Sequence, residues 1–422
     1  MSTLTSDPCH SVSSSSHDGT AHSRRWRVLA AGTLANAAFS MVFNGIPMTA
    51  IMLRSQYSLD TFSLGLALGV MGLGIALSEL PWGMLTDRWG DRPVLLLGLS
   101  GTAAALVALA IWGAPHGGYT PAFALLCGGL LLLGLLGGSV NGASGRAIMA
   151  WFGPKERGLA MSIRQTGIPT GGALGALFLP WLARASGFGA VFALLAICSL
   201  LSLALVWAWV QDPPHHNEAE MAPSNAVKAS RTSALHRPGI WRMSLGIGVL
   251  CIPQFAILSF GSIFLHDFAH LGFTAIAAVM VSLQLGAMIM RVWSGYWTDK
   301  HGNRTPYLRA CTVLSVILFA VLALAAAANA PGPLLAVILA LCGIAVSAWH
   351  GVAYAELATE AGAAQTGTAL GLANTLVFIA NFLTPLGIAW LLHAQRWDWV
   401  WWAAGAFALS ALPLIAARAK RA

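Results

Sequence analysis

Long apolar runs dominate the chain and limit its fold more than any other feature. A helix of about 20 residues crosses the hydrocarbon core of a bilayer. Twelve runs of that length follow one another between residues 28 and 416. They are too long for barrel strands and lack period-two alternation, and backbone polar groups in lipid must be satisfied internally. Each run is therefore predicted to be a membrane-spanning helix.

The boundaries of these runs define twelve predicted spans. They are Val28–Leu53, Phe62–Trp82, Pro93–Trp112, Pro121–Ala143, Leu159–Ala183, Phe188–Val210, Met243–Phe264, Thr274–Trp293, Tyr307–Ala327, Pro333–Tyr354, Thr368–Leu391 and Trp397–Ala416.

Composition excludes several other classes of protein. Of the 422 residues, 57% are hydrophobic and only 9% are charged, whereas soluble domains carry about 25% charged residues. A soluble enzyme, a disordered protein and an ordinary nucleic-acid binder are thereby excluded. The net charge of +8 is explained by basic residues in short loops. Five of the six cysteines lie inside apolar runs without CxxC spacing, so neither a disulfide framework nor a metal site is predicted.

Polar stretches divide the chain into domains. Residues 1–27 are Ser/His-rich and are predicted to form a disordered cytoplasmic tail, and residues 417–422 a short C-terminal one. The longest polar interior stretch, 211–242, is predicted to be a cytoplasmic linker. It would separate an N-terminal six-helix bundle, 28–210, from a C-terminal one, 243–416.

The distribution of basic residues predicts the orientation. With the N-terminus inside, 17 Lys and Arg residues fall in inside segments and 3 in outside segments. Cytoplasmic loops of membrane proteins carry such an excess. Both termini are expected to be cytoplasmic, in a bacterial inner (plasma) membrane.

The two halves share a loop motif. GMLTDRWGDRP begins at Gly83, and GYWTDKHGNRTP begins at Gly295, 212 residues later. The preceding helices also carry ionisable groups at matching positions, Glu79 and Arg291. Because both copies run in the same direction, we expect an all-α membrane protein. Its 12 transmembrane helices would form two six-helix bundles related by a pseudo-two-fold axis along the membrane normal.

This loop resembles the signature of the major facilitator superfamily of secondary transporters. The WFGPKERG stretch at Trp151 and the GIPTGG stretch at Gly167 also resemble family elements, the latter being typical of drug and metabolite exporters. The resemblance covers nearly the whole chain after the first two dozen residues. It implies transport by alternating access, with the motif loops latching the cytoplasmic face.

Charged groups near the cytoplasmic ends of the spans are predicted to gate or couple transport. Carboxylates of Asp87 and Asp299, placed just past a helix end, can accept hydrogen bonds from a neighbouring helix N-terminus. For the basic motif residues, a purely topological role is the alternative. The predicted gating and coupling set is Asp87, Arg88, Arg92, Glu79, Arg146, Arg291, Asp299, Glu356 and His350.

The substrate site is predicted from polar groups inside the spans. Arg164 lies about six residues into the fifth span, where a guanidinium can bind a carboxylate bidentately. Gln165 adjoins it, and a structural ion pair at the gate is the alternative. Asn44, Gln254 and Gln284 lie on spans that line or flank the cavity in the resembled family, with interhelical hydrogen bonds as the alternative.

Together these features predict a secondary transporter of a small organic anion, a mono- or dicarboxylate. A coupling proton or a counter-anion would drive it, by symport or exchange. The alternative is proton-coupled efflux of a hydrophobic drug or metabolite, supported by GIPTGG. We find no Walker motif and no catalytic constellation, so no enzyme, cofactor or metal is expected. The protein is expected to act as a monomer in the lipid bilayer, without nucleic acid.

Overall fold

The computed structural model describes residues 14–211, 233–392 and 396–416. Residues 1–13 of the predicted tail, 212–232 of the predicted linker and the C-terminal tail 417–422 lie outside the described residues. Within the described ranges the chain is helical, apart from short connections and one isolated β-bridge between His116 and Tyr119.

The described residues before Pro238 form nine helical elements. They are α1 (Ser14–Met48), α2 (Ala50–Gln56), α3 (Thr61–Trp89), α4 (Asp91–Ala108), η1 (Leu109–Gly113), α5 (Phe123–Trp151), α6 (Arg157–Gln165), α7 (Gly167–Trp209) and η2 (Ala234–His236).

The second half begins at Pro238. Its elements are α10 (Pro238–Ile263), η3 (Phe264–Phe268), α11 (Phe273–His301), α12 (Arg304–Ala327), α13 (Gly332–Ser347), α14 (His350–Ala361), η4 (Ala363–Gln365), α15 (Thr366–Leu392) and α16 (Trp397–Ala416).

Every predicted span falls on one helix or on two successive helices. Within the described residues, 11 helical stretches are long and apolar enough to cross a membrane. One of them, Arg157–Trp209, has 53 residues and contains both the fifth and the sixth predicted spans. Its backbone breaks at Gly187, which has a φ of 76° that residues with a Cβ rarely adopt. The twelve-helix membrane fold is thereby confirmed.

The helices extend further at their polar ends than predicted. α3 continues to Trp89 and α11 to His301, so Asp87 and Asp299 lie in the last helical turn and not past it. The two helices end at Gly90 and Gly302, which take φ values of 89° and 65°. Glycine adopts positive φ without a Cβ penalty, so it ends these helices, and the polar residues before it do not.

Two predicted domain boundaries also differ from the structure. Residues 14–27, expected in a disordered tail, belong to α1. Arg25 anchors this end of the helix, because its Nη1 lies 2.6 Å from Glu156 Oε2 and its guanidinium packs over the Phe152 ring. α10 starts at Pro238, inside the predicted linker, since proline suits the first turn of a helix.

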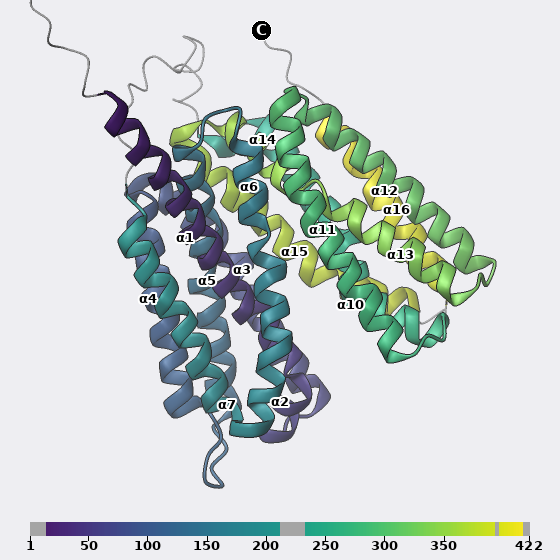
Figure 1. The fold of residues 1–422 in the computed structure, drawn as a ribbon. Coiled ribbons are helices and arrows are strands. Elements are labelled where there is room, and N and C mark those ends of the chain that lie inside the picture. Colours follow the sequence, from purple (N-terminus) through teal and green to yellow (C-terminus); the bar gives the residue numbers. More distant parts are fainter. Residues whose placement is uncertain (1–13, 212–232, 393–395, 417–422) are drawn as a thin grey trace, which may run out of the picture.

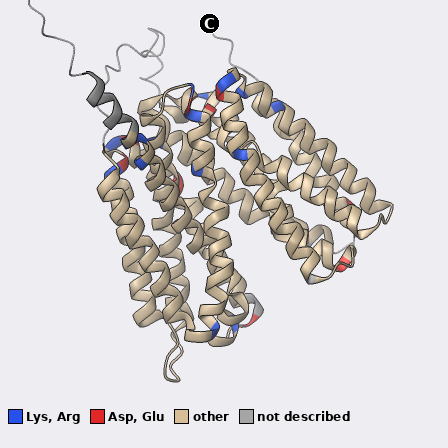
Figure 2. Cartoon of the chain, in the orientation of Figure 1, with Lys and Arg blue, Asp and Glu red and all other residues tan. Residues whose placement is uncertain are grey.

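The two halves form two bundles that converge at one end and diverge at the other (Figure 1). α3 packs against α15, and α6 packs against α11 and α14, so each half contributes to the junction. We call the converging end the motif end, because it holds both loop motifs, 83–93 and 295–306. Lys and Arg residues gather there (Figure 2).

Glycines allow the bundles to touch backbone to backbone at the motif end. A Cβ at Gly83 would collide with the carbonyl oxygen of Gly367 on α15. A Cβ at Gly295 would collide with the carbonyl oxygen of Gly158 on α6. The repeated glycine of each motif therefore serves the contact between bundles.

Candidate transport site and gate

The first motif carboxylate binds the N-terminus of a helix in the other bundle. Asp87 accepts hydrogen bonds from the backbone N–H groups of Gly367 at 2.8 Å and Thr368 at 2.7 Å. Both donors lie in the first turn of α15, where backbone N–H groups lack helical partners and the helix dipole is positive. Asp87 therefore ties α3 to α15.

The second motif carboxylate makes the reciprocal contact. Asp299 accepts from the backbone N–H groups of Gly158 at 3.0 Å and Leu159 at 2.8 Å, in the first turn of α6. These are the contacts that the motif predicted for carboxylates beside a helix end. Each bundle thus holds the other by the same geometry, as the pseudo-two-fold relation requires.

We call the Asp87 contact and the Asp299 contact the two latches. An arginine lies beside the carboxylate of each latch. In the first, Arg146 on α5 lies 2.8 Å from Asp91 and 3.4 Å from Asp87. In the second, Arg304 lies 2.9 Å from Asp299 and 3.8 Å from the carboxylate of Glu356 on α14.

Two further predicted gate cations, Arg92 and Arg88, lie outside these clusters. Arg92 donates to the Trp207 carbonyl of its own bundle at 2.9 Å, and Arg88 is exposed.

Glu79 lies fully buried where α3 crosses α15. Its Oε1 accepts from the Asn141 side chain at 2.5 Å and its Oε2 from the Asn374 side chain at 3.2 Å. The Tyr354 hydroxyl donates to Oδ1 of Asn374 at 2.6 Å. The carboxylate is thus held by neutral amides, one from each bundle.

Arg164 lies beside this carboxylate cluster. Its Nε donates to Ser144 Oγ at 2.9 Å, and its Nη2 donates to the carbonyl of Asn141 at 2.6 Å. Only 2% of the residue is exposed. Asn141 thus contacts Glu79 through its side chain and Arg164 through its main chain.

Arg291 bridges two helix breaks, one in each bundle. Pro169 has no N–H, so the carbonyl of Gln165 at the α6–α7 break lacks its helical partner. Arg291 Nη1 donates to that carbonyl at 3.0 Å, and its Nε donates to the carbonyl of Ser347 at 3.0 Å, where α13 ends. The guanidinium therefore satisfies backbone oxygens that the breaks expose.

The two buried guanidiniums form no ion pair in the described part of the chain. Neither Arg164 nor Arg291 lies within 4.0 Å of a carboxylate oxygen there. Within the same residues, Nη1 of Arg164 and Nη2 of Arg291 make no hydrogen bond. Glu79 interacts with Arg164 electrostatically without contacting it, and each guanidinium keeps a nitrogen that can donate to a further ligand.

Two further predicted residues, Gln254 and His350, contact Ser347, whose carbonyl accepts from Arg291. Gln254 donates to Ser347 Oγ at 3.3 Å, and His350 Nδ1 lies 3.1 Å from the Ser347 carbonyl. The His350 ring stacks on Trp349 with centroids 4.0 Å apart. These contacts join α10, α11 and α14 around Arg291.

Two predicted substrate residues are not brought to the guanidiniums. Asn44 is half-buried on α1 and donates to Ser40 Oγ at 2.8 Å. Gln284 is half-buried on α11. Ser144, Ser347 and Tyr354 also contribute to these clusters and were not predicted. Tyr354 could have been found, because a tyrosine inside an apolar run is unusual in a chain with only 5 tyrosines.

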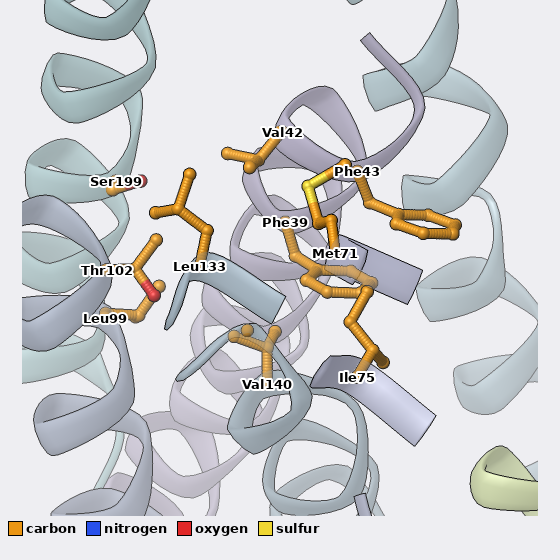
Figure 3. Close-up of a pocket in the computed structure, with 11 residues that line it drawn as sticks. Phe39, Val42, Phe43, Met71, Ile75, Leu99, Thr102, Leu133, Val140 and Ser199 are labelled. Carbon is orange, nitrogen blue, oxygen red and sulfur yellow. The ribbon is translucent and has the colours of Figure 1, made fainter. Parts of the chain in front are cut away.

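A separate small pocket lies inside the first bundle (Figure 3). Thr102 and Ser199 contribute its hydroxyl groups, and the other side chains around it are apolar. Its lining comes from α1, α3, α4, α5 and α7, and includes neither guanidinium. Among the described residues, no group of three or more His, Cys, Asp or Glu side chains could hold a metal ion.

Comparison with known proteins agrees with this architecture. MT3072 of Mycobacterium tuberculosis, an MFS-type transporter, is 30% identical over 96% of this chain and 87% of its own length. The probable galactarate/D-glucarate transporter GudP of Bacillus subtilis is 26% identical, over 42% of this chain and 39% of its own length. Among solved structures, the proton:xylose symporter XylE matches with a TM-score of 0.76 at 18% identity, covering 93% of this chain and 95% of that one.

A family model also matches most of the chain. The model of the Major Facilitator Superfamily covers residues 28–385, from the first span to near the end of α15. That range contains both latches and both buried guanidiniums. The chain therefore belongs to the Major Facilitator Superfamily and is a multi-pass membrane transporter.

Proposed function

We propose that this transporter moves a small organic anion, a mono- or dicarboxylate, by secondary active transport. The observation that carries the proposal is the pair of buried guanidiniums, Arg164 and Arg291, without a carboxylate partner in the described residues. Guanidinium binds carboxylate through parallel N–H donors. In each of these two side chains one terminal nitrogen makes no hydrogen bond to the described residues and can donate to a carboxylate.

The bundles, taken as domains 28–210 and 243–416, rock about this site. The gathering of basic residues supports a cytoplasmic motif end, by the positive-inside rule. The conformation described is then closed towards the cytoplasm, held by Asp87 and Asp299. Opening breaks these contacts and exposes the guanidiniums to the cytoplasm of the bacterial cell.

Two further considerations support the anion class. GudP is by name a probable transporter of galactarate and D-glucarate, which are dicarboxylates, although it matches only part of the chain at 26% identity. A neutral or cationic substrate would gain nothing from two buried guanidiniums. Proton symport or anion exchange would supply the driving force.

Uptake into proteoliposomes tests the class directly. Purified protein is reconstituted with a pH gradient and offered labelled mono- and dicarboxylates, neutral sugars and lipophilic cations. The proposal predicts saturable uptake of at least one carboxylate, absent from protein-free vesicles. Transport of lipophilic cations without any carboxylate would contradict it and favour proton-coupled efflux.

A further inference from the structure

A buried carboxylate lies where α3 of the first bundle packs against α15 of the second, a contact that we call the seam. It is separate from the two latches and from the guanidiniums of Arg164 and Arg291. Glu79 is on α3, one turn before Gly83, and is 0% exposed. A Cβ at Gly371 on α15 would lie 2.5 Å from the Glu79 carbonyl oxygen. The two helices therefore touch through their backbones beside this side chain.

The hydrogen bonds in the seam fit the ionised form of Glu79. Its two oxygens accept amide N–H groups from Asn141 of the first bundle and Asn374 of the second. Tyr354 donates to Oδ1 of Asn374, which directs the amide nitrogen towards Glu79. A carboxylate is an acceptor on both oxygens, so it satisfies both amides.

A protonated Glu79 binds the same partners less strongly. A proton on Oε2 would face the N–H of Asn374. If Asn374 turned its oxygen towards that proton, its nitrogen would face the Tyr354 hydroxyl, which would then accept instead of donate. Protonation also removes the charge that strengthens the hydrogen bonds from Asn141 and Asn374, so it weakens the contact between α3 and α15.

Charged and titratable groups face Glu79 from two of the surrounding helices. Arg164 on α6 and Tyr354 on α14 interact with it electrostatically. Its hydrogen-bond partners on α5 and α15 are neutral amides. Asp87, two turns further along α3, is engaged by Arg146 and the α15 N-terminus.

We propose that Glu79 is the proton-coupling residue of the transport cycle. Ionised, it holds α3 against α15 and keeps the motif end closed. A proton arriving from the opposite side neutralises the carboxylate, weakens its hydrogen bonds from Asn141 and Asn374 and thereby releases the seam. The same proton leaves at the open motif end. This inference rests on the proposed transport function but not on the anionic class of the substrate.

Difference infrared spectroscopy on the lipid-embedded full chain tests protonation without any substrate. As the pH is lowered, a carboxylic-acid C=O band should appear in the wild type and in Asp267→Asn, which removes an exposed carboxylate. Because the chain has 15 Asp and Glu residues, the Glu79 band is the component that the wild type and Asp267→Asn share and that Glu79→Gln lacks. Tyr354→Phe, which keeps the carboxylate and frees the Asn374 amide, should move the pH at which the band appears.

Transport then tests coupling. In Glu79→Gln, uptake driven by a pH gradient should fall by at least about tenfold, while exchange of substrate stays within about threefold of the wild type. Absence of a Glu79-dependent band, or pH-driven uptake that survives Glu79→Gln, would overturn the proposal. A titrating band in a protein that moves no carboxylate would support Glu79 and remove only the substrate class.

Discussion

Replacing Asp87 by asparagine should open the motif end. The carboxylate accepts two backbone N–H groups of α15, at 2.8 and 2.7 Å. The amide side chain would keep one acceptor, set an N–H group against the other donor and remove the charge from the helix N-terminus. A hydrogen bond to a charged group contributes about 1.5–3 kcal/mol, and the dipole adds about 0.3–1 kcal/mol. We expect the closed form to lose about 2–3 kcal/mol.

That loss changes the ratio of closed to open molecules by roughly 30- to 150-fold. A closed form favoured about 100-fold would then leave about a quarter of the molecules open, at the lower limit of this range. Spin labels report the change if cysteines replace Trp89, at the end of α3, and Ala364, before α15, in a cysteine-free background. Both positions are exposed.

The distance distribution between the labels should gain a longer component in Asp87→Asn. Asp267→Asn, at an exposed site, serves as the control and should match the wild type. An unchanged distribution in Asp87→Asn, at neutral pH and without substrate, would refute the latch role of Asp87.

Three further predictions concern the glycines and Arg291. Gly83→Val should prevent closure, because its side chain would occupy the place of the Gly367 carbonyl, and the same label pair should report the open form. Gly187→Ala should cost about 1–3 kcal/mol, because residue 187 has a φ of 76° and a ψ of −178°, and should lower the thermal unfolding midpoint. Gly128→Ala, in α5 with open space around it, should not lower that midpoint. Arg291→Lys should reduce carboxylate uptake by about tenfold or more, since one ammonium cannot reproduce the planar fork that reaches two carbonyls.

The fold was predictable because its determinants are local. Span length and apolarity fix the helices, and the repeated motif fixes the relation of the two halves. The helix ends were predicted less well. The sequence places Asp87 and Asp299 beside polar residues typical of loops, but the helices run on to Gly90 and Gly302, where the backbone takes positive φ.

The centre of the molecule was only partly predictable because its contacts are distant in sequence. Glu79 and Asn374 are separated by 295 residues, and nothing local indicates their pairing. Pro169 signals a free carbonyl on α6, but not that Arg291 reaches it. The break after Ser347 has no proline to mark it. Asn44 and Gln284 were predicted from span number alone, which says nothing about which face of a helix carries them.

Carboxylate uptake by arginine variants tests the central claim most directly. Proteoliposomes holding wild type, Arg164→Gln, Arg291→Gln or the exposed-site control Arg184→Gln are compared over a range of dicarboxylate concentrations. We expect both buried-site variants to lose saturable uptake, while Arg184→Gln transports like the wild type. Wild-type uptake by Arg164→Gln and Arg291→Gln would show that these guanidiniums stabilise the closed gate and do not bind the substrate.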